Sequence, residues 1–220
     1  MRKILIFSLV LLSVLSSAIS LDEAYKLANI THRKLVIMFS SPTCYYCNLF
    51  KKEVYPKEDF QKILIPNFVF VELYATNEKS IVFAKEVLGE DSVTYRELFQ
   101  GFGVRGTPTF FFFDGKKGLG YLPGYVEKDL FIKILKYVAQ ELQEDFETYI
   151  KKEDPFKGVP MIIEISRSDA DFVLEKDENA LRIEKVPEEV ELDKIYITED
   201  PQVADELKNK GAIRVLLIVD

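Results

Sequence analysis

The stretch LVIMFSSPTCYYCNLF (35–50) decides the fold of this chain, because it joins a buried strand to a helix that opens with a cysteine pair. Residues 35–40 form a continuous apolar run of strand length, which is typical of a strand covered on both faces. A short turn follows, and then a predicted helix that ends before Pro56. Cys44 and Cys47 are the 2 cysteines among the 220 residues.

The position of this pair predicts thiol–disulfide chemistry. Backbone N–H groups at a helix N-terminus stabilise an anion, so Cys44 is expected to be a reactive thiolate. Cys47 lies one turn further along, where it can attack a mixed disulfide formed on Cys44. Tyr45 and Tyr46 add no cation beside that thiolate, which argues against a very strong oxidant. Their rings are expected either to form an apolar rim for substrate contact or simply to pack.

Other uses of two cysteines are limited by the ligands that the chain offers. A zinc site wants about four ligands, whereas the chain has 2 Cys and 1 His, His32. Covalent haem attachment needs a histidine directly after the second cysteine, and Asn48 stands there. Copper(I) held by the two thiolates and an inert structural disulfide stay open as alternatives. No metal and no small-molecule cofactor is predicted, because the electrons pass through the cysteines.

Residues 1–20 have the layout of a cleaved secretory signal peptide. A basic start precedes the apolar run 4–15, and the small residues SSAIS (16–20) follow it. A retained membrane anchor is the alternative, although the run is short for a span of about 20 residues. Export predicts a periplasmic or other extracytoplasmic location, where disulfides form and persist. The net charge of -7 makes a nucleic-acid partner unexpected.

Apolar spacing predicts the elements that surround the cysteine motif. A helix is expected within 21–34, and NFVFVELYA (67–75) is expected as a second buried strand, parallel to the first. Residues 76–93 are treated as an insertion. The remaining predicted elements are a helix over 94–104, a hairpin of strands at 107–114 and 119–124, and a long amphipathic helix from Val126.

Residues 21–150 resemble the thioredoxin superfamily, and more closely its exported SoxW-type thioredoxin-like members. The resemblance rests on the buried strand, the C-Y-Y-C at a helix start, GTPTFFFFD (106–114), the hairpin and the last helix. It implies an α/β thioredoxin fold, with a central mixed sheet flanked by helices. The implied activity is that of a thiol–disulfide oxidoreductase with Cys44 as nucleophile and Cys47 as resolver. The implied partners are exported proteins with thiols or disulfides, and a membrane redox partner.

The resemblance also assigns roles around the cysteines. It implies a cis bond between Thr107 and Pro108, with the backbone of Thr107 binding an extended substrate peptide. Thioredoxins usually carry a tryptophan at the position of Thr43, and this chain has no Trp.

A second departure concerns proton transfer. Cytosolic thioredoxins keep a buried acid where Met38 stands in this chain. Glu72, on the neighbouring predicted strand, is therefore the candidate base for Cys47. The alternative is that Glu72 lies at a strand edge in solvent.

The last part of the chain predicts a second, smaller α/β domain. Residues 151–157 are charged, contain a proline and read as a linker, and residues 158–220 follow as the domain. Its strands are expected at 161–166, 195–200 and 213–220, with a helix over 201–211. The order of elements faintly resembles a rhodanese-like domain, but the loop TEDPQ (198–202) lacks the catalytic cysteine of rhodaneses. A docking or dimerisation role is therefore expected.

Overall fold

The strand β1 (Lys34–Ser40) lies inside the first sheet, and every residue of it after Lys34 is buried. It pairs in parallel with β2 (Phe68–Tyr74) and antiparallel with β5 (Thr109–Asp114). β6 (Lys117–Pro123) completes a mixed sheet in the order β2-β1-β5-β6. The computed structural model describes residues 19–219, so the predicted signal peptide lies, apart from its last two residues, outside the described part.

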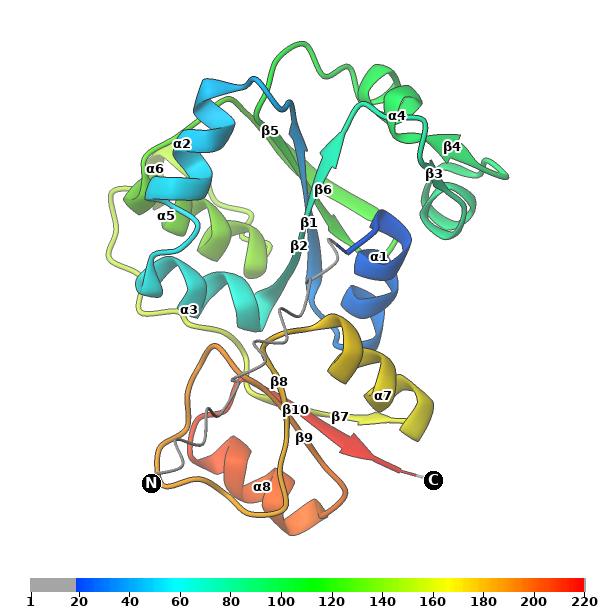
Figure 1. The fold of residues 1–220 in the computed structure, drawn as a ribbon. Helices are drawn as coiled ribbons and strands as arrows, with labels where there is room; N and C mark the ends of the chain where they lie inside the picture. The colour runs from blue at the N-terminus through cyan, green and yellow to red at the C-terminus, as the bar shows by residue number, and fades with distance from the viewer. Residues whose placement is uncertain (1–18, 220) are drawn as a thin grey trace, which may run out of the picture.

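Helices cover both faces of this sheet (Figure 1). Val36 and Met38 of β1 point into a core shared with α2 (Tyr45–Glu53), α3 (Glu58–Asn67) and α5 (Lys128–Ala139). Leu35, Ile37 and Phe39 point the other way, toward α1 (Leu21–Ile30) and α4 (Tyr95–Gly101). The period of two along a strand produces this alternation. The result is the central mixed sheet flanked by helices that the resemblance implies.

An aromatic cluster fixes α2 on the sheet. The ring of Phe50 is buried at its centre, 5.1 Å from the ring of Phe110 on β5 and 5.5 Å from that of Phe131 on α5. Phe60 of α3 lies 6.0 Å from Phe50 in an edge-on arrangement. Such offset and edge-on pairs add stability beyond the burial of their area. The helix that carries the cysteine motif is therefore held by large, closely packed side chains.

The insertion at 76–93 forms a short hairpin and a π-helical segment. The hairpin pairs β3 (Lys79–Ser80) with β4 (Val93–Thr94), and η1 (Ala84–Leu88) lies between them. The carboxylate of Asp22 accepts hydrogen bonds from Ser80 Oγ and from three backbone N–H groups of residues 81–83. Burial alone would raise the pKa of Asp22, but these hydrogen bonds outweigh it and lower the pKa. The insertion is thereby tied to the first turn of α1.

A second sheet follows an irregular stretch that comprises residues 151–160. It contains four parallel strands in the order β7-β10-β9-β8, and α7 and α8 pack on it. This finding confirms the second α/β region, while its boundaries as a separate domain stay a prediction. Between the two regions lies the short helix α6 (Phe146–Tyr149). The elements of the second region are β7 (Met161–Ile165), α7 (Arg167–Lys176), β8 (Ala180–Arg182), β9 (Ile195–Thr198), α8 (Pro201–Asn209) and β10 (Arg214–Ile218).

The sequence patterns used above did not predict α7, which packs against α1. Its segment RSDADFVLEK is mostly polar, and only Ala170 and Val173 of it are fully buried. A signal was nevertheless present, because Ser166 caps the helix by accepting a hydrogen bond from the backbone N–H of Asp169. The narrow buried stripe explains why periodicity missed this helix.

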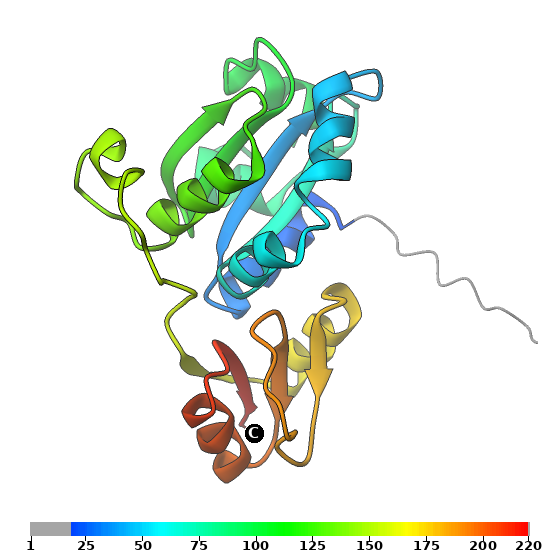
Figure 2. The same ribbon diagram turned by 90° about the vertical axis from the view of Figure 1, so that its left-hand side faces the viewer.

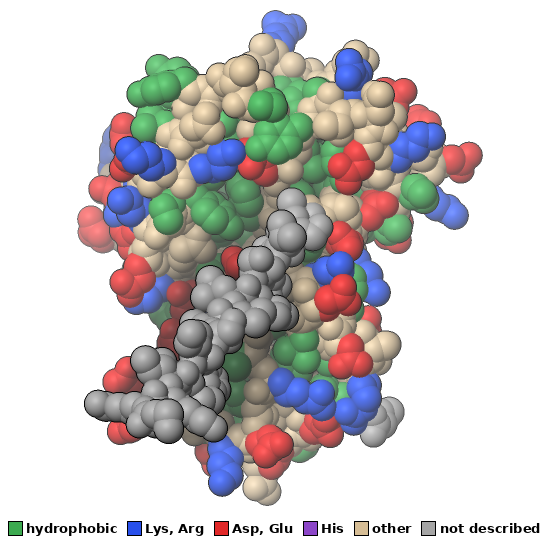
Figure 3. Space-filling model, in the orientation of Figure 1, with side chains coloured by type: hydrophobic (Ala, Val, Ile, Leu, Met, Phe, Trp, Pro, Cys, Tyr) green, Lys and Arg blue, Asp and Glu red, His purple; other side chains and the backbone are tan. Residues whose placement is uncertain are grey.

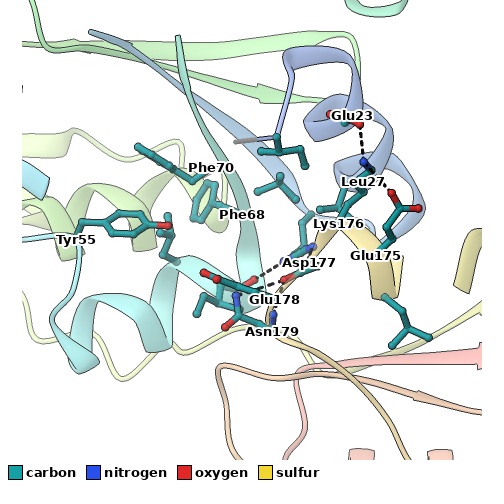
Figure 4. A pocket seen from close by; sticks show the side chains of 16 residues that line it. Glu23, Leu27, Tyr55, Phe68, Phe70, Glu175, Lys176, Asp177, Glu178 and Asn179 are labelled. Atoms are coloured by element: carbon teal, nitrogen blue, oxygen red, sulfur yellow. Dashed lines mark hydrogen bonds and ion pairs between the residues drawn. The ribbon is translucent and has the colours of Figure 1, made fainter. Parts of the chain in front are cut away.

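Figure 2 shows the two regions one above the other. They are joined by charged contacts as well as by the packing of α7 on α1. Arg33 and Asp177 form an ion pair of 2.6 Å in which both side chains are almost completely buried. Lys176 reaches Glu23 at 2.8 Å. Figure 4 shows Glu23, Lys176 and Asp177 beside a pocket of about 730 Å³ that is lined by residues of α1, α3, β2 and the end of α7. Arg33 and Asp177 are 144 positions apart in the sequence, so their contact connects the first region to the second.

The outer surface carries both signs of charge. Figure 3 shows acidic and basic side chains interspersed over the visible face. Among the helices of residues 19–219, none is long and apolar enough to span a membrane.

The buried ion pair predicts that the two regions stabilise each other. We expect Asp177→Asn to lower the free energy of unfolding by about 3 kcal/mol, because it leaves the Arg33 cation buried without its partner. Replacing both residues by apolar ones, as Arg33→Met with Asp177→Leu, should cost less. Urea unfolding followed by far-UV circular dichroism measures both values. Glu58→Gln, which removes a solvent-exposed pair with Lys62, is the control, and an Asp177→Asn variant as stable as that control would contradict the prediction.

Candidate functional site

The cysteine pair lies where β1 ends and α2 begins. Cys44 is the N-cap of α2, and its sulfur accepts a hydrogen bond of 3.0 Å from the backbone N–H of Cys47. The two sulfurs form a disulfide. Cys44 is partly exposed, whereas Cys47 is completely buried. Because only one sulfur can be reached from solvent, the two cysteines are not equivalent in any reaction with a large partner.

A proline loop lies against Cys44. The Thr107–Pro108 peptide bond is cis, the isomer that the resemblance implies. The carbonyl oxygen of Thr107 lies 3.3 Å from Cys44 Sγ. The carbonyl oxygen of Pro108 accepts a hydrogen bond of 2.8 Å from the backbone N–H of Gly124, which fixes this loop to the end of β6. The tertiary structure thus brings together the predicted residues Cys44, Thr107 and Pro108.

Tyrosine rings surround the exposed side of the disulfide. The side chains of Tyr45 and Tyr46 are 71% and 54% exposed, so they do not pack in the core. Their ring centroids are 5.3 Å apart, and Tyr46 stacks on Tyr125 at 6.0 Å. Burial, together with the negative charge of Glu127, raises the pKa of Tyr125. We call Tyr45, Tyr46 and Tyr125 the aromatic rim.

Sequence reasoning missed Tyr125. A signal for it existed, because Tyr125 directly follows Gly124, at the end of the hairpin strand that pairs with the proline strand. Only the pairing of β5 with β6 shows that this end of the hairpin lies near the cysteine motif.

The core beneath the disulfide contains the apolar side chain of Met38 instead of an acid. Met38 is completely buried, and in the parallel register it stands opposite Glu72 on β2. Glu72 therefore lies on the face of the sheet that α2 and Cys47 cover. It is on the edge strand β2, one strand away from Met38 on β1. Its side chain is 20% exposed, and its carboxylate lies 3.0 Å from the ammonium of Lys51 on α2. Glu72 is thus neither fully in solvent nor fully buried, and its role as a base stays a prediction.

Metal-binding geometry is not found in the described residues. Within residues 19–219 no group of three or more His, Cys, Asp or Glu side chains could hold a metal ion. His32 is exposed, on the turn between α1 and β1, at the opposite end of β1 from the cysteine pair.

A family model described as a thioredoxin-like domain matches residues 21–139. This protein belongs to the thioredoxin-like family. The predicted membership of the thioredoxin superfamily is therefore confirmed for the first region of the chain. Together with the Cys44–Cys47 disulfide, it supports a thiol–disulfide redox function for this thioredoxin-like protein.

Solved structures similar to this thioredoxin-like protein include a thioredoxin-fold protein from Helicobacter pylori, which is 21% identical with a TM-score of 0.45 over 59% of this chain and 94% of that one. A thioredoxin from Thermus thermophilus is 27% identical with a TM-score of 0.40, over 53% and 81% of the two chains. The periplasmic thioredoxin SoxS from Paracoccus pantotrophus is 20% identical with a TM-score of 0.33, over 50% and 98%. Family membership rests on the family model rather than on these scores. No curated protein matches this chain.

The position of Glu72 yields a test of its predicted role. If its carboxylate accepts the proton of the Cys47 thiol, Glu72→Gln should slow the resolution of a mixed disulfide by about 10-fold or more near neutral pH. The loss should shrink as the pH rises, because Cys47 then ionises without help. Stopped-flow kinetics with a fluorescent mixed disulfide on Cys44 measures this step. Glu53→Gln, at the end of α2, is the control. An unchanged rate profile in Glu72→Gln would remove Glu72 from the mechanism.

Proposed function

We propose that this protein is an exported thiol–disulfide reductase that acts on other exported proteins. The observation that carries the proposal is the asymmetry of the pair: Cys44 is accessible at the N-terminus of α2, and Cys47 is buried behind it. The proximity of the Thr107 carbonyl to Cys44 Sγ supports a binding edge for an extended peptide next to the reactive sulfur.

The reaction proceeds by two exchanges of sulfur bonds. In the reduced protein the Cys44 thiolate attacks one sulfur of a substrate disulfide, and the other substrate sulfur leaves as a thiolate. Cys47 then loses its proton and attacks Cys44 Sγ, which releases the first substrate sulfur as a second thiolate. The substrate has gained two electrons, and Cys44 and Cys47 are left as a disulfide. A membrane-bound dithiol protein is the proposed donor that returns the pair to the dithiol.

The proposed direction of electron flow is supported by how the thiolate is stabilised. In a strong oxidant the reduced form is unusually stable. Here the N–H of Cys47 supports the Cys44 sulfur, while Tyr45 and Tyr46 contribute no positive charge. This favours a reductase with a potential nearer to about -270 mV than to about -120 mV.

The first test is the reduction potential and the trapping of partners. We expect equilibration with glutathione or dithiothreitol buffers to give the lower of the two potentials, measured by maleimide gel shift because the chain has 0 Trp to report by fluorescence. Cys47→Ser should accumulate mixed disulfides with exported proteins, and Cys44→Ser should accumulate none, because its remaining thiol is buried. Equal trapping by both variants would contradict the assigned roles.

The alternative function is transport of copper(I) bound by the same two thiolates. Metal binding and disulfide exchange must therefore both be measured on the reduced protein. Retention of one copper(I) per reduced protein, together with failure to exchange with any disulfide, would replace the reductase proposal. Disulfide exchange without metal retention would support it.

The aromatic rim predicts selectivity for protein substrates. Tyr45→Ser and Tyr46→Ser should raise KM for a protein disulfide severalfold, because apolar contact area is lost. The same variants should leave the reduction of a small aliphatic disulfide unchanged. Tyr121→Ser is the matched control, since Tyr121 is 65% exposed on β6 and its ring stacks on Phe111 instead of joining the rim. An equal effect on both substrates would show that the rim acts on the chemistry rather than on substrate binding.

A further inference from the structure

The guanidinium of Arg214 lies buried between the two regions of the protein. Arg214 is the first residue of β10 and is only 5% exposed. Its Nη1 donates to the carbonyl oxygens of Val159 and Ile213, and its Nη2 donates to that of His32, at 3.2 to 3.3 Å. Its Nε–H has no hydrogen-bond partner among residues 19–219. A guanidinium has five N–H donors, so this one keeps unused hydrogen-bonding capacity.

The other cations near Arg214 are neutralised by carboxylates. Arg33 pairs with Asp177, and Lys34 pairs with both Asp114 and Glu141. Within the described part of the chain no carboxylate pairs with Arg214, whose partners are carbonyl dipoles. Burial, and then repulsion from Arg33, lowers the pKa of Arg214 to about 10, so the group is still charged at neutral pH. A buried charge without a counter-charge is costly, so binding of an anion next to Arg214 would stabilise the folded protein.

A cavity of about 400 Å³ opens onto this group. Arg33, Lys34 and Arg214 line it, and Asp114 is the carboxylate in its lining. Asn67 also lines it, but the amide of Asn67 already donates to the carbonyl oxygens of Ile63 and Lys157. Cationic residues of both regions, Arg33 and Lys34 from the first and Arg214 from the second, therefore lie around the same space. An arginine fork is well matched to the paired oxygens of an oxyanion.

We propose that this cavity binds a small oxyanion, of the size and charge of sulfate, through the Arg214 guanidinium. The anion supplies the missing counter-charge, and it links the first region to the second because donors from both lie around it. The site lies at the Lys34 end of β1, whereas the disulfide follows the Ser40 end. At about 3.3 Å per residue the two ends of this strand are about 20 Å apart. The proposal is thus independent of the redox function.

Sulfate is the probe for the test. Equilibrium dialysis with radiolabelled sulfate, at constant ionic strength maintained with chloride, should show one saturable site per chain. Sulfate should also raise the midpoint of thermal unfolding over chloride, because it binds the folded state alone. Arg214→Gln should weaken sulfate binding by about 10-fold or more, which is the loss expected for a hydrogen bond to a charged group. The matched control is Arg182→Gln, which removes an exposed arginine that pairs with Glu199 on the second sheet.

The position of the anion gives a readout that does not depend on a variant. Crystals of the unmodified protein soaked in selenate should show its anomalous signal within hydrogen-bond distance of Arg214. A sulfate affinity no higher than that of chloride, or selenate located only elsewhere, would overturn the proposal. Unchanged sulfate binding in a folded Arg214→Gln protein would overturn it as well. If Arg214→Gln does not fold, the location of selenate in the unmodified protein decides.

Discussion

Burial of β1 on both faces is the constraint on which the rest of the structure depends. A strand without a solvent face must be covered by two layers of helices, and its neighbours must satisfy its backbone groups on both sides. β2 and β5 provide those hydrogen bonds, and the helices of the two cores provide the cover. Because β1 is fixed in this way, the turn after Ser40 places Cys44 at one defined position beyond the C-terminal end of β1.

The chemistry of the site follows from what lies on each side of that point. The aromatic packing of Phe50 presses α2 onto the sheet and buries Cys47, while Cys44 stays at the open end of the helix. The return of the chain through β5 then places the Thr107 carbonyl beside the accessible sulfur. Cys44 and Cys47 thus differ in burial and in position on α2, with an uncharged Met38 beneath them and the Glu72–Lys51 pair one strand away.

The opposite end of β1 lies at the contact between the first region and the second. There the chain turns at His32, whose carbonyl oxygen accepts a hydrogen bond from Arg214 of β10, and the next residue, Arg33, pairs with Asp177 at the end of α7. The charge of Arg33 is neutralised by Asp177 of the second region. Arg214 of the second sheet bonds to the carbonyl oxygen of His32 and has no carboxylate partner among residues 19–219. One strand therefore connects a redox centre at one end with a polar, charged junction at the other. Because α7 packs on α1, buried residues of both regions belong to one hydrophobic core.

The sequence by itself determined the fold class and the reactive pair. An apolar run followed by Cys44 and Cys47 at a helix start, with the Thr107–Pro108 pair further along, depends on local spacing, and local spacing is visible in a sequence. The tertiary structure alone decided which distant residues join them. Tyr125 enters the rim through strand pairing, Glu72 meets Lys51 through the register of β2 against β1, and the mostly polar α7 becomes a core helix because α1 covers its narrow apolar stripe. The lack of a counter-charge at Arg214 is likewise a property of three-dimensional surroundings, since charge pairing is set by distance in space and not along the chain.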